Sequence, residues 1–265
     1  MTNIKSICAV AAAAFLTAFG LGGCKDVPEV NPDIQKGSNT WVVTVGMENS
    51  KFAGACPGAG IDAERMTKLL GAYATHLKAF SSETATKVAV TKAMKEAAAN
   101  AELFIFYYSG HGGSEPFYDT GAEEVDGKDE FLCLYDTWMT DNEVWAIIKN
   151  CKGRFLMIND CCHSQTMFRQ PICFDLDKYA KAMRATHTES GPINMQCWSG
   201  CPDDTYSYGS STGGKFTNTL LKYFDARKTY EYLWNEIESD KSLQQYEAVQ
   251  RTLMGDSFTG RPVFR

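Results

Sequence analysis

Short apolar runs alternate along the chain with segments in which apolar residues recur at helical spacing. The clearest runs cover residues 41–46 (WVVTVG), 102–108 (ELFIFYY) and 154–159 (RFLMIN). Each is short, continuous and rich in β-branched or aromatic residues, which is typical of a strand buried on both faces. Weaker patterns of the same kind predict strands over residues 76–80, 130–136 and 193–198.

Between these runs, apolar residues are spaced three or four positions apart. Residues 62–73 carry Met66, Leu69, Leu70 and Tyr73 at this spacing, which predicts an amphipathic helix. Further helices are predicted over residues 87–100, 141–150, 216–224 and 230–239. Strands that alternate with helices imply a mostly parallel sheet covered on both faces. The pattern therefore predicts an α/β fold.

The first 23 residues have a different character. Lys5 gives a positive start, and residues 7–19 form an alanine-rich apolar core with the proportions of a secretory signal rather than a membrane span. The sequence Leu21-Gly22-Gly23-Cys24 resembles a bacterial lipoprotein box. We therefore expect an exported protein of the cell envelope, cleaved before Cys24 and anchored to a membrane by lipid on Cys24. The alternative is a plain signal peptide with an incidental cysteine.

Residues 24–40 contain two prolines and little apolar material, and are predicted to tether the anchor to a domain over residues 41–265. Composition limits what this domain can be. Apolar residues make up 44% and charged residues 22%, which suits a globular protein with a core. The formal net charge of −6 argues against a nucleic-acid partner. No C-x-x-C pair is present, so a zinc ribbon is excluded, and the spacing of the cysteines does not determine any disulfide.

Two predicted strands end in residues suited to nucleophilic catalysis. The strand over 102–108 runs into Ser109-Gly110-His111-Gly112-Gly113, and the strand over 154–159 into Asp160-Cys161-Cys162-His163-Ser164. In open α/β sheets, sites form beyond the carboxyl ends of the strands. An imidazole near a cysteine supports the thiolate, and glycines let a substrate carbonyl approach backbone N–H groups. We therefore expect a cysteine nucleophile with a histidine partner.

These motifs resemble those of caspase-like cysteine peptidases, and within them the metacaspase branch, closest to its bacterial members. Tyr108-Ser109-Gly110-His111-Gly112 is similar to the histidine motif of that family, and Asp160-Cys161-Cys162-His163-Ser164 to its cysteine motif. The separation of His111 from Cys162 is close to the ~50 residues of caspases. Weaker similarities lie at Cys56 with Asp62-Ala63, and at residues 126–130, 140–143, 199–204 and 260–264. The resemblance runs from about Trp41 to the C-terminus. It implies a caspase-like α/β/α sandwich with a six-stranded sheet, and endopeptidase activity on proteins or peptides.

By resemblance, His111 and Cys162 form the catalytic dyad, and the backbone N–H groups of Gly112 and Cys162 are the oxyanion donors. Asp62, Asp160 and the hydroxyl of Ser109 would line the pocket for the residue before the scissile bond. Buried carboxylates would receive Arg or Lys there, because a charge in a pocket needs an opposite charge.

No cofactor and no resident metal ion are expected. Acidic residues near Asp126, Asp129 and Asp141 could form a calcium site, but a weak one. Asn142 follows Asp141 where calcium-dependent members have paired aspartates, and calcium prefers several carboxylate or carbonyl oxygens.

Other interpretations of the same residues stay open. Gln165 stands where the family usually has glycine, which motivates a catalytically inactive caspase-like domain that binds a protein partner. Cys161, Cys162 and His163 could instead serve a metal or redox protein, although adjacent cysteines do not easily present tetrahedral ligands together. Asp62 could be only the N-cap of the helix that it precedes.

Overall fold

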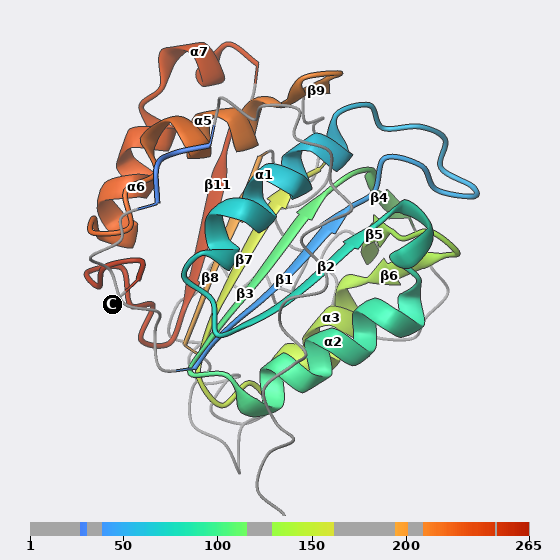
Figure 1. Ribbon diagram of the computed structural model, residues 1–265, viewed down its shortest axis with the longest axis horizontal. Coiled ribbons are helices and arrows are strands. Elements are labelled where there is room, and N and C mark those ends of the chain that lie inside the picture. The colour runs from blue at the N-terminus through green and yellow to red at the C-terminus, as the bar shows by residue number, and fades with distance from the viewer. Residues whose placement is uncertain are drawn as a thin grey trace, which may run out of the picture.

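A computed structural model describes residues 27–30, 39–115, 129–161, 194–200, 209–246 and 248–264. Its centre is a six-stranded sheet in the order β11-β8-β7-β3-β1-β2 (Figure 1). Only β11 runs antiparallel to its neighbour; the other four pairings are parallel. The strands are β1 (Thr40–Gly46), β2 (His76–Ser81), β3 (Leu103–Ser109), β7 (Arg154–Asp160), β8 (Asn194–Ser199) and β11 (Gln250–Met254). The predicted α/β fold with a mostly parallel six-stranded sheet is confirmed.

Helices cover both faces of this sheet (Figure 1). One face is covered by α1 (Ala59–Gly71), α5 (Lys215–Tyr223) and α6 (Tyr230–Glu238), and the other by α2 (Lys87–Asn100) and α3 (Asp141–Ile148). Smaller elements lie at the edges of these layers. They are η1 (Ser82–Thr84), α7 (Lys241–Gln244), the antiparallel sheet of β4 (Gly112–Glu115), β5 (Asp129–Cys133) and β6 (Trp138–Thr140), and the hairpin of β9 (Gly209–Ser210) and β10 (Gly213–Gly214).

The continuous apolar run of β3 follows from burial on both faces. Phe104, Phe106 and Tyr108 pack in the cluster under α2 and α3, whereas Ile105 and Tyr107 pack under α1, α5 and α6. Successive side chains of a strand point to opposite faces, so both halves of the alternation must be apolar. The same alternation directs Ser109, at the end of β3, toward the α1 side.

One predicted strand is placed differently in the structure, and one strand of the main sheet was not predicted. The strand predicted over 130–136 is β5, which ends at Cys133 and belongs to the small antiparallel sheet. The sixth strand of the main sheet is β11, which the apolar pattern did not predict. It is an edge strand with a largely half-exposed sequence, so no apolar run marks it.

Helix α1 begins at Ala59, three residues earlier than predicted, because Gly58 takes the N-cap position with φ of 97°. Asp62 therefore lies inside the first turn, and the interpretation of Asp62 as the N-cap is wrong. Within the predicted tether, Val27 and Val30 pack against the apolar cluster on the α1 side, and Thr40 opens β1. Within the described ranges, no helix has the length and apolar content needed to cross a bilayer.

Candidate active site

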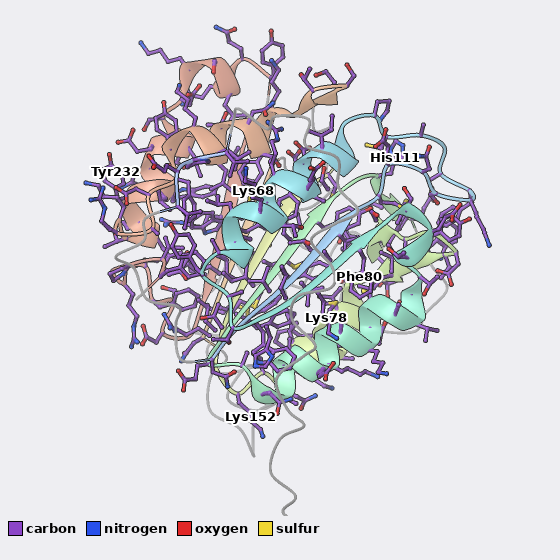
Figure 2. The ribbon with its side chains drawn as sticks, in the orientation of Figure 1. Lys68, Lys78, Phe80, His111, Lys152 and Tyr232 are labelled. Carbon is purple, nitrogen blue, oxygen red and sulfur yellow. The ribbon has the colours of Figure 1, made fainter. Side chains whose placement is uncertain are left out.

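The two motifs leave the sheet side by side. The parallel register of β3 and β7 pairs Ser109 with Asp160, and the N–H of Gly110 donates to the carbonyl of Asp160 at 3.3 Å. Both strands end at the same edge, where Figure 2 shows His111. The structure thus brings the histidine motif to the start of the cysteine motif. Cys162, Cys24, Asp126, His163 and Gln165 lie outside the described residues.

Asp62, Ser109 and Asp160 converge on the α1 side of this edge. Asp62 Oδ2 accepts hydrogen bonds from Ser109 Oγ at 3.1 Å and from the N–H of Gly214 at 2.8 Å. Asp62 Oδ1 pairs with Arg65 Nη2 at 2.8 Å, one helical turn along α1. Two distant strands, β3 and β10, and a neighbour on α1 itself therefore hold this one carboxylate.

The second carboxylate, Asp160, is held by α5. Its Oδ2 accepts from the N–H of Thr217 at 2.9 Å and from Thr217 Oγ1 at 2.7 Å. The hydroxyl of Tyr107 lies 2.7 Å from the same Thr217 oxygen. Because Thr217 Oγ1 donates its hydrogen to Asp160, Tyr107 must donate to Thr217, and the three groups form a directed chain that ends on the carboxylate.

The hairpin β9–β10 comes unusually close to both acids. A β-carbon on Gly213 would lie 2.2 Å from Asp62 Oδ1, and one on Gly214 would lie 2.1 Å from Asp160 Oδ2. Gly213 also has φ of 109°, a conformation that L-residues rarely adopt. Only glycine therefore fits at these two positions with the carboxylates where they are.

Burial sets the electrostatics of the pair, because Asp62 is 1% exposed and Asp160 is 5% exposed. Burial, and then the charge of Asp160, raise the pKa of Asp62 to about 7, although the Gly214 N–H and Arg65 lower it. Burial also raises the pKa of Tyr107 well above its usual range, with both carboxylates contributing. Tyr107 is therefore neutral at physiological pH, and the two acids form a compact negative centre that can hold a cationic group.

His111 is held by the segment that precedes α1. Its Nε2 lies 3.0 Å from the carbonyl oxygen of Ala55, so a proton on Nε2 completes this hydrogen bond. The N–H of Cys133 donates to the carbonyl of His111 at 3.0 Å, one residue before β4 begins. This bond flanks the first pair of β4 and β5, Gly112 with Leu132, and marks it as a non-hydrogen-bonded pair, so the N–H of Gly112 is directed away from β5.

The other sequence candidates lie away from this centre. Cys161 is 1% exposed and packs in the apolar cluster on the α2 side. Asp129 Oδ1 accepts a hydrogen bond of 2.6 Å from Asn142 Nδ2, and Asp141 is buried in the first turn of α3. Across the residues that the structure describes, no group of three or more His, Cys, Asp or Glu side chains could hold a metal ion.

The sequence pattern of the caspase domain matches residues 41–256, which is most of the chain. The chain belongs to the caspase domain family. It is 27% identical to Metacaspase-1 of Cryptococcus neoformans, an alignment that covers 53% of this chain and 44% of that protein. It is also 27% identical to Metacaspase-3 of Arabidopsis thaliana, over 52% of this chain and 42% of that protein. The chain thus spans about half the length of the curated relatives that it matches.

Two solved structures share the fold of this chain. The Geobacter sulfurreducens protein GSU0716 is 20% identical and matches with a TM-score of 0.63, over 85% of this chain and 98% of that one. Caspase-1 of Spodoptera frugiperda is 12% identical and matches with a TM-score of 0.54, over 82% and 88%. At these identities the likeness concerns the fold alone. The predicted family resemblance and caspase-like fold are confirmed.

Some residues of the acidic centre in this caspase domain were not predicted. They are Arg65, Gly213, Gly214 and Thr217, which hold or approach the two carboxylates. The signals available in the sequence were a Gly-Gly pair before a predicted helix and a basic residue one turn after Asp62. Neither signal identifies a partner, because Thr217 meets Asp160 across 57 positions of the chain and Gly214 meets Asp62 across 152.

Proposed function

We propose that this caspase-family domain is a cysteine endopeptidase that cleaves after Arg or Lys and uses His111 and Cys162 as its catalytic dyad. The observation that carries the specificity is the convergence of Asp62, Asp160 and Ser109 beside the histidine motif. Two nearly buried carboxylates are costly unless a cation offsets them, and a basic substrate side chain supplies one. Arg is expected to be preferred over Lys, since its planar fork can bond bidentately.

The proposed reaction uses the histidine as its geometry suggests. The hydrogen bond from Nε2 to Ala55 leaves Nδ1 for proton transfer. His111 takes the proton of Cys162 as its Sγ attacks the substrate carbonyl carbon, and the N–H groups of Gly112 and Cys162 stabilise the oxyanion. The C–N bond then breaks as His111 gives a proton to the leaving amine. Water, activated by His111, hydrolyses the thioester and releases the Cys162 thiolate.

A set of peptides that differ only in Arg, Lys, citrulline or Asp before the scissile bond tests this function. Cleavage should follow Arg and Lys, and Cys162→Ala should abolish it, because a methyl group cannot attack a carbonyl. His111→Ala should lower kcat/KM by a factor of roughly 10²–10⁴. Cys161→Ala is the matched control, since that neighbouring thiol packs in the core.

Three results would separate the alternatives. Preferential cleavage after Asp would contradict the acidic pocket. Cleavage that depends on Cys161 but not on Cys162 would show that Cys161 is the nucleophile and that the proposed dyad is wrong. No cleavage, together with no labelling of Cys162 by a peptide-based thiol reagent, would favour the inactive protein-binding domain that Gln165 motivates.

We also propose that lipid on Cys24 anchors the mature chain to a membrane of the cell envelope, on the strength of Leu21-Gly22-Gly23-Cys24 after an apolar leader. Cys24→Ser should move the protein from the membrane fraction to the soluble fraction. A variant that still sediments with membranes after a salt wash would contradict the anchor.

A further inference from the structure

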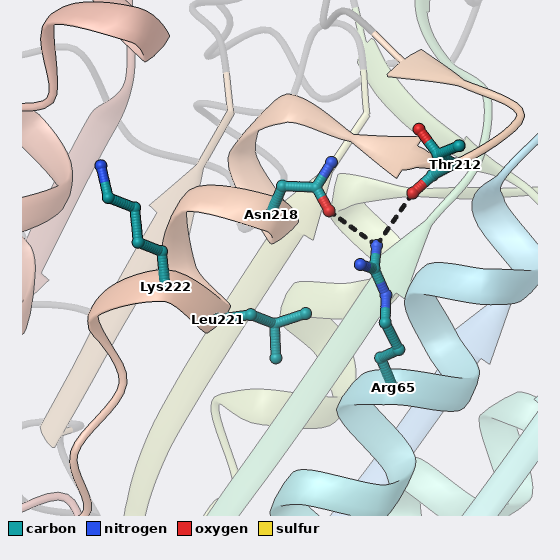
Figure 3. A pocket seen from close by; sticks show the side chains of 5 residues that line it. All are labelled: Arg65, Thr212, Asn218, Leu221 and Lys222. Carbon is teal, nitrogen blue, oxygen red and sulfur yellow. Dashed lines mark hydrogen bonds between the residues drawn. The ribbon is translucent and has the colours of Figure 1, made fainter. Parts of the chain in front are cut away.

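Arg65 joins the acidic centre to two other parts of the fold, and Figure 3 shows its hydrogen bonds to Asn218 and Thr212. Its Nη2 lies 2.8 Å from Asp62 Oδ1, 2.8 Å from Asn218 Oδ1 on α5 and 3.2 Å from the carbonyl oxygen of Thr212 in the turn before β10. The residue is only 5% exposed. A buried guanidinium beside one of two pocket carboxylates is therefore a built-in charge of that pocket, held in a fixed position.

The described residues allow the charges of the pocket to be counted. Asp62 and Asp160 are the acids, and Arg65 is the cation that contacts Asp62. The hydrogen-bonding groups of Ser109, Tyr107, Thr217 and Gly214 are neutral. Lys222 lines the same cavity of about 420 Å³ as Arg65, but its ammonium pairs with Asp240 at 2.7 Å. With both acids ionised, the counted groups carry one net negative charge.

We propose that Arg65 is a specificity-determining residue, whose guanidinium offsets one of the two carboxylates so that the pocket presents a single net negative charge to one Arg or Lys side chain. This inference rests on the proposed function. It adds a residue outside both catalytic motifs, on the helix that carries Asp62. One substrate cation then neutralises the pocket, whereas an acidic side chain meets an unbalanced carboxylate.

The titration of Asp62 supports this role and makes it measurable. With Arg65 present, the pKa of Asp62 is raised to about 7 by burial and by Asp160. Loss of the Arg65 charge would raise it further, because a neighbouring cation within ~4–6 Å lowers a carboxyl pKa by roughly 1–3 units. Asp62 would then be protonated at neutral pH, and a substrate cation would face Asp160 alone.

The test compares two peptides that differ only in Arg or citrulline before the scissile bond. Citrulline keeps the shape of arginine without its charge. The titration of the dyad affects both peptides equally, so it cancels in the ratio of their kcat/KM values. In the wild type this ratio should rise with pH through a midpoint near 7, as Asp62 ionises. In Arg65→Gln the midpoint should move upward by roughly 1–3 pH units.

Two further variants separate charge from structure. Arg65→Lys keeps the charge but not the three-way hydrogen bonding, so it should return the midpoint toward that of the wild type. Lys68→Gln removes the same charge from the exposed side of α1 (Figure 2) and should leave the midpoint unchanged. Circular dichroism establishes that each variant is folded. If Arg65→Gln misfolds, the comparison of Arg65→Lys with Lys68→Gln still tests the proposal. A midpoint that differs from that of the wild type in Arg65→Lys, but not in Lys68→Gln, would overturn a role of Arg65 through its charge.

The outcomes also distinguish this inference from the function on which it rests. A wild type that favours Arg over citrulline, with the same midpoint in a folded Arg65→Gln, would overturn the role of Arg65 and leave the function intact. A wild type with no such preference at any pH would refute the basic specificity itself. Binding of both peptides to the full chain with Cys162→Ala, measured by fluorescence anisotropy, gives the same ratio without turnover.

Discussion

Replacing Gly214 with alanine should displace the carboxylate of Asp160. A β-carbon on Gly214 lies 2.1 Å from Asp160 Oδ2 and 2.6 Å from Asp160 Cγ, whereas ordinary contact begins at 3.4 Å. Gly214 has φ of −74°, which alanine adopts without strain, so the conflict is with the carboxylate and not with the backbone conformation. Relief requires a movement of about 1 Å, which is incompatible with the hydrogen bonds of 2.7 and 2.9 Å from Thr217.

The size of the effect follows from those two hydrogen bonds. A hydrogen bond to a charged group contributes about 1.5–3 kcal/mol, so losing both would cost about 3–6 kcal/mol, and keeping one would halve this. We expect the free energy of unfolding to fall by about 3 kcal/mol and Tm by about 6–12 °C, since 1 kcal/mol corresponds to about 2–4 °C at this size. Cleavage after Arg should fall about tenfold or more, because Asp160 no longer faces the pocket.

Gly209→Ala is the matched control for this substitution. Gly209 pairs with Gly214 in the same hairpin, but its β-carbon would meet nothing closer than 3.8 Å. Urea unfolding followed by circular dichroism, and kcat/KM with an Arg peptide, should separate the two variants. Equal stability and equal cleavage in Gly214→Ala and Gly209→Ala would refute the steric argument and the place it gives to Asp160.

Two further predictions concern stability. The pKa of Asp62 is raised from 3.8 to about 7 in the folded chain, so the unfolded chain loses this proton first as pH rises. The free energy of unfolding of the wild type, relative to that of Asp62→Asn, should therefore fall between about pH 4 and pH 7 in urea titrations. A difference that does not vary with pH would contradict this. Asp240 accepts hydrogen bonds from the N–H groups of Ser242 and Leu243 at the start of α7 and pairs with Lys222. Asp240→Ala should therefore lower the free energy of unfolding by about 1–2 kcal/mol, and an unchanged Tm would contradict the role of Asp240 as the helix cap.

The parts of the fold that the sequence predicts are those whose surroundings leave a pattern. Strands β1, β3 and β7 are buried on both faces, so their residues are continuously apolar. Helix α2 has the predicted bounds because Thr86 caps its start, accepting from the N–H of Ala89. Edge strand β11 and the short strands β4 and β6 leave no such pattern, since partners elsewhere in the chain define them.

The acidic centre divides in the same way. Asp160 and Ser109 directly follow or end buried strands, and Asp62 opens an amphipathic pattern, so chain position alone marks them as candidates. Thr217 and Gly214 could not be assigned, because the bond from Gly214 to Asp62 joins residues 152 positions apart. Nothing in the sequence around a glycine indicates that its N–H binds a carboxylate so far away along the chain.

That long-range bond also has a consequence for the order of events during translation. Both carboxylates are synthesised before β10 and α5, whose N–H groups of Gly214 and Thr217 bind them. Phe258, Val263 and Phe264, which pack in the apolar layer on the α1 side, are synthesised later still. A ribosome-bound chain that ends before β10 holds two acids without these donors, and contacts of such high sequence separation form late. The acidic centre is therefore assembled only after β10 and α5 have been synthesised, well after the helix and the strand that carry its two acids.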